Sequence, residues 1–533
     1  MNDNNLAARE AAQNALNNFK VTPTSLLQYQ SRGRVAVIGS DEAAEFAPRL
    51  SAPLQAQVVM ISGVDEPGVP LLAVGGRELS ISGHLGNFVI ALGDSGKPNF
   101  EQLRVDMVID MSDEPLLKMP MPPLGYFATD TEESSLSRVL LEVQALVGTF
   151  EKPRFFNYDA AICAHGRSGN IACTRCIDAC PAEAITSLRE KIEVDPFLCQ
   201  GGGVCSTACP SGAISYSYPQ AGDQLEKIKL LLKTYRQHGG QHPVLVFVAE
   251  DDISLLDKLA ANYLLVGVEE LASVGIEVWL GALAYGAERV ELLQTGVIGD
   301  AVIALLDQQL LTAVEILQAL GYPAEALRRV ALQNWPEPLQ TGMPAIKPAT
   351  YAAMGGKRQN AFAAIDHLFE HAPAAKPMIN LSVGAPFGMA QVEASRCTLC
   401  LSCVSACPGK ALMQGEGVPQ VRFIEANCLQ CGMCTRTCPE DAISISPRIV
   451  FDRQQRQQPR VLFEEAPFEC ISCGKPFATR AVIDRMLQKL AGHWMFQDER
   501  SRSRLQMCED CRVIDAIQDE NAMKSGFEGV TRQ

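Results

Sequence analysis

The sequence predicts a multidomain chain of mixed α/β and α+β structure, and three observations lead to this fold class. The chain has 533 residues, which is too long for one compact core. All 19 cysteines lie at or after Cys163, in three groups with metal-ligand spacing. Outside these groups, strand-like and helix-like segments alternate without cysteine. We therefore expect three cysteine-rich modules and two small α/β domains.

Residues 1–150 are expected to form the first α/β domain. A polar helical lead-in to residue 31 precedes three strand candidates, which are Arg34–Ser40, Gln57–Gly63 and Val105–Ser112. Gly39 ends the first strand, but neither a G-x-G-x-x-G pattern nor a Walker lysine follows it. We interpret Gly39 as a structural turn. A proline-rich connection is expected at Pro115–Gly125.

The clearest cysteine pattern lies in residues 388–450, where C-x2-C-x2-C-x3-C-P occurs twice. This is the run of bacterial two-cluster ferredoxins, in which the fourth cysteine of each run binds the other run's cluster. One predicted [4Fe–4S] cluster takes Cys397, Cys400, Cys403 and Cys438. The other takes Cys428, Cys431, Cys434 and Cys407. Zinc-bound cysteines are the disfavoured alternative, because zinc sites rarely need four evenly spaced thiols on one loop.

Residues 151–218 follow the same plan with two departures, since Asn170 and Gly202 stand where the regular pattern has cysteine. The seven cysteines predict one complete [4Fe–4S] site, with ligands Cys163, Cys173, Cys176 and Cys209. The remaining three form a three-thiolate site, with ligands Cys180, Cys199 and Cys205. That site is expected to hold either [3Fe–4S] or a [4Fe–4S] cluster whose last iron binds water, substrate or another side chain. The predicted total is three [4Fe–4S] clusters and this fourth one.

Residues 219–334 carry no cysteine after the first module and predict a second α/β domain. Its strand candidates are Val244–Glu250 and Glu288–Thr295, and its helix candidates are Ile253–Leu265 and Glu277–Ala287. A linker is expected at 335–387, a short polar linker at Asp452–Arg460, and a polar tail at 516–533.

The last module, residues 465–515, contains two C-x2-C knuckles, with cysteines Cys470, Cys473, Cys508 and Cys511. Two such knuckles are the usual way to build a tetrahedral four-thiolate site. The intervening segment Ala481–Leu490 places apolar residues on one helical face, which gives a small domain that needs a metal for stability. We expect a zinc-ribbon-like module with zinc, and rubredoxin-like iron or a fifth iron–sulfur cluster remain the alternatives.

The net charge and the distribution of apolar residues limit where the protein is expected in the cell and which classes of partner it is expected to bind. The net charge of 46 − 61 = −15 disfavours binding to nucleic acid or to an anionic membrane surface. No run approaches the ~18 uncharged apolar residues of a membrane span, and the N-terminus lacks a signal-peptide pattern. We therefore expect a cytoplasmic protein without membrane insertion.

Parts of the sequence resemble two known protein families. The segments Pro153–Pro181, Asp195–Ile214 and Phe468–Phe477 resemble bacterial cytoplasmic multi-cluster 4Fe–4S proteins that are associated with formate dehydrogenase operons. The segment Leu271–Gln294 is similar to the delta subunit of methyl-viologen-reducing hydrogenases, which relays electrons. That subunit carries cysteines for a [2Fe–2S] cluster, whereas this domain has none, so the resemblance implies the fold and a docking role only.

Taken together, these patterns favour an electron-transfer protein or subunit between a low-potential dehydrogenase of the formate dehydrogenase kind and another redox partner. An accessory or maturation factor for such a molybdenum enzyme is the alternative. No catalytic residue stands out in the sequence, so we expect a non-catalytic electron carrier or redox-complex subunit. An enzyme that uses an open iron beside Gly202 is a third hypothesis.

Overall fold

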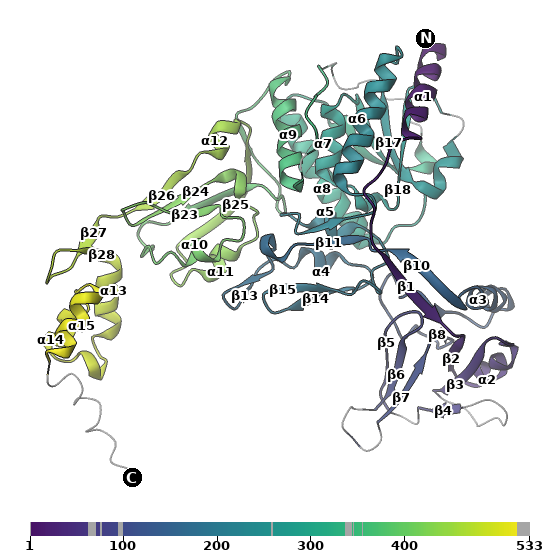
Figure 1. The fold of residues 1–533 in the computed structure, drawn as a ribbon, viewed down its shortest axis with the longest axis horizontal. Coiled ribbons are helices and arrows are strands. Elements are labelled where there is room, and N and C mark those ends of the chain that lie inside the picture. The colour runs from purple at the N-terminus through teal and green to yellow at the C-terminus, as the bar shows by residue number, and fades with distance from the viewer. Residues whose placement is uncertain are drawn as a thin grey trace. The chain divides into compact units, whose positions relative to one another are not determined.

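The computed structural model describes residues 2–61, 71–74, 77–93, 97, 100–256, 259–335, 344, 346–353 and 355–519 (Figure 1). The chain forms two compact units. The first comprises Met1–Ala160 and Thr174–His371, and the second comprises Ala161–Cys173 and Ala372–Gln533. The predicted polar tail lies outside the described residues from position 520 onward.

A parallel five-stranded sheet forms the N-terminal domain of the first unit. Its strand order is β4-β3-β2-β8-β9, with β4 Leu71–Ala73, β3 Gln55–Met60, β2 Arg34–Gly39, β8 Met107–Asp110 and β9 Tyr126–Ala128. Val35 and Val37 of β2 face a core that includes helices α2 (Asp41–Phe46) and α3 (Glu133–Ala145). Ala36 and Ile38 face the opposite core, formed with an antiparallel sheet of β5 Leu79–Ser82, β6 Phe88–Leu92 and β7 Glu101–Val105. All three predicted strands are present, and burial on both faces explains their continuous apolar runs.

The N-terminal lead-in contains more structure than its polar composition indicated. Helix α1 spans Asn2–Leu16, as expected, but strand β1 follows at Leu26–Ser31. β1 pairs antiparallel with β10, Gly148–Pro153, along its whole length. The partner is more than a hundred residues away in sequence, so local composition could not indicate this pairing.

The cysteine-free domain of the first unit is a parallel four-stranded sheet of order β18-β17-β19-β20. Its strands are β17 Val244–Ala249, β18 Tyr263–Val268, β19 Arg289–Gln294 and β20 Leu327–Ala331. The helices of this domain are α6 Ala221–Gln237, α7 Ile276–Ala284, α8 Asp300–Ala319 and α9 Lys357–Glu370. Both predicted strands and the helix predicted at 277–287 agree with β17, β19 and α7.

Two expectations for this region were wrong. The helix expected at Ile253–Leu265 is a 3-10 turn, Glu250–Leu256, followed by strand β18, with residues 257–258 outside the described part. A buried parallel strand is as uniformly apolar as a buried helix, so periodicity could not separate them. The segment expected as a linker at 335–387 contains α9, whose residues Ala361, Ala364, Ile365 and Leu368 are buried. Helix α9 packs against α7.

The second unit is built around the second cysteine module. Strand β25, Ile443–Val450, pairs with β21 Met378–Asn380 and β22 Gly388–Val392. A second small sheet joins β23 Leu412–Gln414, β24 Gln420–Phe423 and β26 Arg460–Glu464. The short linker expected at Asp452–Arg460 instead contains helix α12, Arg453–Gln457. The Asp452 side chain stabilises the start of this helix, because it accepts a hydrogen bond from Gln455 N at 2.6 Å.

The C-terminal module of this unit is a hairpin followed by three helices. The hairpin is β27 Pro467–Glu469 with β28 Pro476–Thr479, and the helices are α13 Arg480–Leu490, α14 Glu499–Arg504 and α15 Glu509–Ile517. Ile483 is buried in α13, on the apolar face that the sequence predicts. In the part of the chain that the structure describes, no helix combines the length and apolar character that crossing a bilayer requires.

Candidate metal centres

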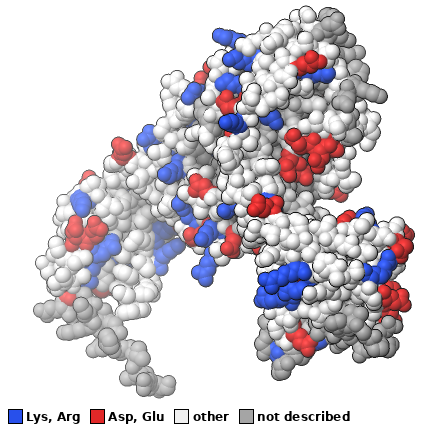
Figure 2. Space-filling view, turned by 45° about the vertical axis from the view of Figure 1, so that its right-hand side comes forward, with Lys and Arg blue, Asp and Glu red and all other residues white. Residues whose placement is uncertain are grey.

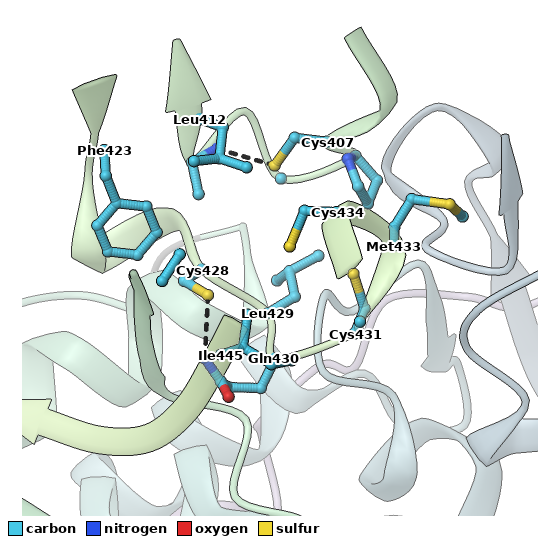
Figure 3. Close-up of a pocket in the computed structure, with 15 residues that line it drawn as sticks. Cys407, Leu412, Phe423, Cys428, Leu429, Gln430, Cys431, Met433, Cys434 and Ile445 are labelled. Carbon is cyan, nitrogen blue, oxygen red and sulfur yellow. Dashed lines mark hydrogen bonds between the residues drawn. The ribbon is translucent and has the colours of Figure 1, made fainter. Parts of the chain in front are cut away.

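Four cysteines from two separate runs meet in one pocket of the second unit. The pocket is lined by Cys407, Cys428, Cys431 and Cys434, the set that the sequence predicts for one cluster. Figure 3 shows the four sulfur atoms pointing toward one another, beside the apolar side chains of Leu412 and Phe423. Cys428 and Cys431 come from the loop before helix α11, Met433–Thr437, and Cys407 follows helix α10, Ser402–Ala406. The crossed arrangement is what two adjacent cubane clusters require.

The other predicted set lines a second pocket of the same unit. It contains Cys397, Cys400, Cys403 and Cys438, together with Val392, Leu399, Val421 and Ile443. Soft thiolates beside apolar side chains are the donor set that iron–sulfur clusters use. The structure thus brings all eight cysteines of this module into two groups of four, and their role as iron ligands remains a prediction.

Backbone geometry repeats between the two cysteine loops. Leu399 and Leu401 have φ values of 54° and 60°, and the equivalent Gln430 and Gly432 have 51° and 77°. These left-handed residues curl the loop so that several cysteines face one point. Amide groups also point at sulfur. Ala411 N lies 3.3 Å from Cys407 Sγ, and Ala442 N lies 3.3 Å from Cys438 Sγ. Such bonds stabilise added negative charge on a bound cluster and raise its reduction potential.

Burial in these pockets shifts the pKa values of several cysteine thiols. Burial, with a smaller contribution from neighbouring cysteines, raises the pKa of Cys403 and of Cys431 to about 12. Burial likewise raises the pKa of Cys434. An isolated thiolate is therefore unfavourable here, whereas a thiolate that delivers its charge to iron is stabilised.

The three cysteines of the predicted incomplete site all belong to the first unit. Cys180 follows helix α4, Arg175–Ala179, and Cys205 lies in helix α5, Val204–Ala208. Burial raises the pKa of Cys205 well above its usual value, and the charges of Cys199 and Cys180 raise it further. Burial also raises the pKa of Cys199, and the charge of Cys180 acts in the same direction. Cys176 and Cys209, which are predicted for the other site, act on Cys205 in the same direction, and Cys180, Cys199 and Cys205 as one ligand set remain a prediction.

The loop around Gly202 has the geometry of a complete cysteine loop without its middle thiol. Gly201 and Gly203 have φ values of 82° and 70°, matching the left-handed positions on either side of Cys400 and Cys431. A Cβ atom at Gly202 would lie 3.8 Å from Pro181 Cγ and 3.9 Å from Met121 Cε, which are ordinary contacts. Gly202 therefore lies at the loop position that Cys400 and Cys431 occupy in the second module, and it has room for a side chain.

The proline-rich connection covers this loop. Met121 N donates to Pro181 O at 3.0 Å, and the Gln200 amide donates to Pro122 O. The segment is anchored by Asp110, which accepts from Leu116 N at 2.8 Å. These contacts place an apolar methionine side chain, rather than solvent-exposed backbone, beside the position of the missing cysteine.

Two lysines that sequence reasoning missed donate to the backbone of this module. Lys152 Nζ lies 2.7 Å from Cys199 O, and Lys357 Nζ lies 2.7 Å from Ser206 O and 2.8 Å from Thr207 O. Burial lowers the pKa of Lys152 to about 8, while the charge of Cys199 acts in the opposite direction. Lys152 therefore carries a positive charge at pH 7. No local sequence signal links these lysines to the cysteine loops, because their contacts are non-local.

We expect Lys152→Met to lower the reduction potential of a cluster bound through Cys199. A positive charge beside a cluster favours its reduced, more negative state, and about 1.4 kcal/mol of lost interaction corresponds to about 60 mV for one electron. Potentiometric titration followed by EPR measures the shift. Lys20→Met, at an exposed position of the same unit, is the control. Equal potentials in wild type and Lys152→Met would contradict this role.

The four cysteines predicted for the complete site of the first module are divided between the two units, with two in each. Cys176 and Cys209 lie in the first unit, where the charges of both raise the pKa of Cys205. Cys163 and Cys173 lie in the second unit, on either side of a small hairpin of β12 Gly166–Arg167 and β13 Asn170–Ile171. The buried His165 ring donates from Nδ1 to Cys173 O at 2.8 Å and fixes this hairpin.

The C-terminal module brings its four cysteines into one site. One ligand atom from each of Cys470, Cys473, Cys508 and Cys511 lies within 4.8 Å of the others. Cys470 Sγ accepts from Cys508 N at 3.2 Å, and Cys508 directly precedes helix α15. Burial acts to raise the pKa of Cys470, but backbone N–H groups that include that of Cys508 hold it below its usual value. The Cys470 thiolate, the form that binds metal, is therefore favoured. For Cys511, the Ser472 hydroxyl acts to lower the pKa, but hydrogen bonds with Cys473 and Cys508 outweigh it and raise the pKa to about 12.

This module is attached to the loop of a neighbouring cysteine pocket. Thr479, the N-cap of α13, donates from Oγ1 to Thr398 O at 3.2 Å, next to Cys397. Arg485 of α13 forms an ion pair of 2.5 Å with Glu440, two residues after Cys438. Both contacts depend on α13 being folded.

Two models of known protein families match parts of the chain. Residues 396–442 match the family described as "4Fe-4S dicluster domain", and residues 192–215 match the "4Fe-4S binding domain". The second match includes Gly202 and its flanking cysteines. No curated protein matches the chain. The protein thus contains ferredoxin-type 4Fe–4S domains, and domains of this kind imply electron transfer.

Proposed function

We propose that the chain relays electrons between a low-potential dehydrogenase of the formate dehydrogenase kind and a second redox partner. In this proposal the eight cysteines of residues 388–450 hold two [4Fe–4S] clusters. The seven cysteines of residues 151–218 hold one further [4Fe–4S] cluster and one cluster with three thiolates. The C-terminal four-cysteine site holds zinc and has a structural role.

One observation carries the proposal, and it lies within the second unit. The hairpin between Cys163 and Cys173 packs against helix α11, where Arg436 Nη1 donates to Ile171 O at 2.8 Å. Burial is the largest cause that raises the pKa of Cys431, and the charge of Cys173 contributes to the same increase after those of Cys407 and Cys428. A predicted ligand of the first module therefore lies beside a predicted ligand of the second. Because electron tunnelling slows steeply with distance, neighbouring ligand sets favour transfer between their clusters.

The charge distribution supports docking through local patches. The chain has a net charge of −15, and Figure 2 shows separate acidic and basic patches divided by neutral surface on the face in view. Complementary patches steer redox partners to a defined orientation and accelerate association. The cysteine-free α/β domain, which is similar to a hydrogenase delta subunit, serves in this proposal as a docking domain.

Reduction by formate tests the proposed donor. The holoprotein is mixed anaerobically with formate and a catalytic amount of formate dehydrogenase, and bleaching of cluster absorbance is followed. We expect bleaching only when the dehydrogenase is present, and a stable complex with the mature enzyme. Binding to the immature enzyme alone, without cluster reduction, would indicate the alternative, an accessory or maturation factor. Bleaching in neither case would contradict the proposed donor.

We expect Arg436→Ala to slow electron transfer between the two modules, because it removes the hydrogen bond that fixes the hairpin on α11. Freeze-quench EPR after partial reduction reports how fast the clusters equilibrate. Arg396→Ala is a matched control, since Arg396 also lies next to a cysteine loop but pairs with Asp441 at 3.6 Å. Equal slowing in both variants would show an effect of charge alone and would contradict the role of the hairpin.

A further inference from the structure

Helix α9 carries a cluster of metal-ligating side chains outside all the cysteine sites. His367, Glu370 and His371 follow one another in the spacing H-x-x-E-H, so they share one face of the helix. One ligand atom from each lies within 4.8 Å of the other two. Sequence reasoning missed the cluster because this segment was expected to be a linker.

Backbone carbonyls fix the orientation of both imidazole rings. His367 Nε2 lies 2.8 Å from Lys347 O, and His371 Nδ1 lies 2.9 Å from His367 O. A carbonyl oxygen only accepts, so each of these ring nitrogens carries a hydrogen. In a neutral ring, the lone pair is then on Nδ1 of His367 and on Nε2 of His371. Metal-binding histidines typically donate their second nitrogen to a carbonyl in this way.

The two rings also lie close together, with their planes tilted. Their centroids are 4.4 Å apart, with an angle of 36° between the planes. The Glu370 side chain is exposed and lies beside them, at the end of α9. The carbonyl end of a helix carries partial negative charge, which favours a cation there.

We propose that His367, Glu370 and His371 bind one Zn²⁺ ion, with water completing the coordination. Two imidazole nitrogens and one carboxylate are a ligand set that zinc accepts while keeping a position open. The site is independent of the iron–sulfur centres, because it offers nitrogen and oxygen rather than thiolate. The competing explanation is that two neutral histidines only stack at a helix end.

Zinc counting on the intact holoprotein separates these explanations. Iron and zinc are measured by mass spectrometry after equilibrium dialysis against micromolar Zn²⁺, with the cysteine sites already filled. We expect His371→Gln to bind one zinc fewer per chain than wild type, and Glu370→Gln to bind that zinc more weakly. His238→Gln is a matched control. Like His371, His238 donates from Nδ1 to the carbonyl four residues earlier, at 2.9 Å. That earlier residue is Thr234 rather than a second histidine.

Equal zinc counts in wild type, His371→Gln and Glu370→Gln would overturn the proposal. Loss of the same zinc in His238→Gln would overturn it as well. If His371→Gln also loses iron, the variant has disturbed the fold. Glu370→Gln then decides, because its exposed side chain can change without disturbing the core.

Discussion

Gly202→Cys is expected to add one iron atom per chain and to abolish the EPR signal of an oxidised three-iron cluster. The new thiol would complete the set formed by Cys180, Cys199 and Cys205. The structure accommodates it, because the nearest atoms to a Cβ at this position are 3.8 Å and 3.9 Å away and the backbone is not left-handed. Iron analysis and EPR of anaerobically purified protein measure the change. If the wild type instead holds four irons there, its last iron is lost on mild oxidation, and Gly202→Cys retains it.

Two controls restrict the interpretation of this experiment. Gly202→Ser adds a side chain of similar size without a thiolate, so we expect the wild-type iron count and signal. Gly203→Cys is expected to destabilise the loop, because its φ is 70° and its Cβ would lie 2.5 Å from Ser273 Cα. Ordinary four-iron signals with the same iron count in wild type and Gly202→Cys, both before and after mild oxidation, would contradict a three-thiolate site.

The two cysteine pockets of residues 388–450 were predictable from sequence because the spacing within each cysteine loop is local. In each loop, a residue with positive φ precedes the central position and another follows it. This pattern recurs around Cys400, Cys431 and Gly202. Spacing alone therefore indicated which cysteines would be grouped, including the crossed positions Cys407 and Cys438. The assignment of Gly202 to a ligand position rests on the same repeat.

What the sequence did not reveal depends on contacts between distant segments. β1 is recognisable only through its partner β10, and α9 only through the core that its apolar residues join. The contact of Lys152 with the backbone of Cys199 also joins segments that are distant in sequence. Such features come from tertiary packing, which overrides or supplements local propensity. The hairpin at β12 and β13 is another case, since its packing on α11 joins segments more than 250 residues apart.

We expect removal of the metal from the C-terminal site to unfold residues 467–519 while the other modules keep their iron. In the described part of this module, few large side chains are buried, among them Ile483 and Leu505 at 2% and 4% exposure. A core of this size does not offset the entropy of ordering the chain. Structural zinc supplies about 10–16 kcal/mol in comparable small modules, so Cys473→Ser is expected to have the same effect as a chelator.

Hydrogen exchange measures this outcome segment by segment. In Cys473→Ser, amides of α13 and α15 should exchange at the rate of an unfolded chain, whereas those of β25 stay protected. Glu469→Gln, at the exposed position before Cys470, is the control and should match wild type. Retained protection of α13 after Cys473→Ser would show that the core suffices without metal. Because Thr479 and Arg485 attach α13 to the loops of Cys397 and Cys438, unfolding should also speed the loss of iron from that pocket under oxygen. Iron loss unchanged by Cys473→Ser would show that the module does not shield the cluster.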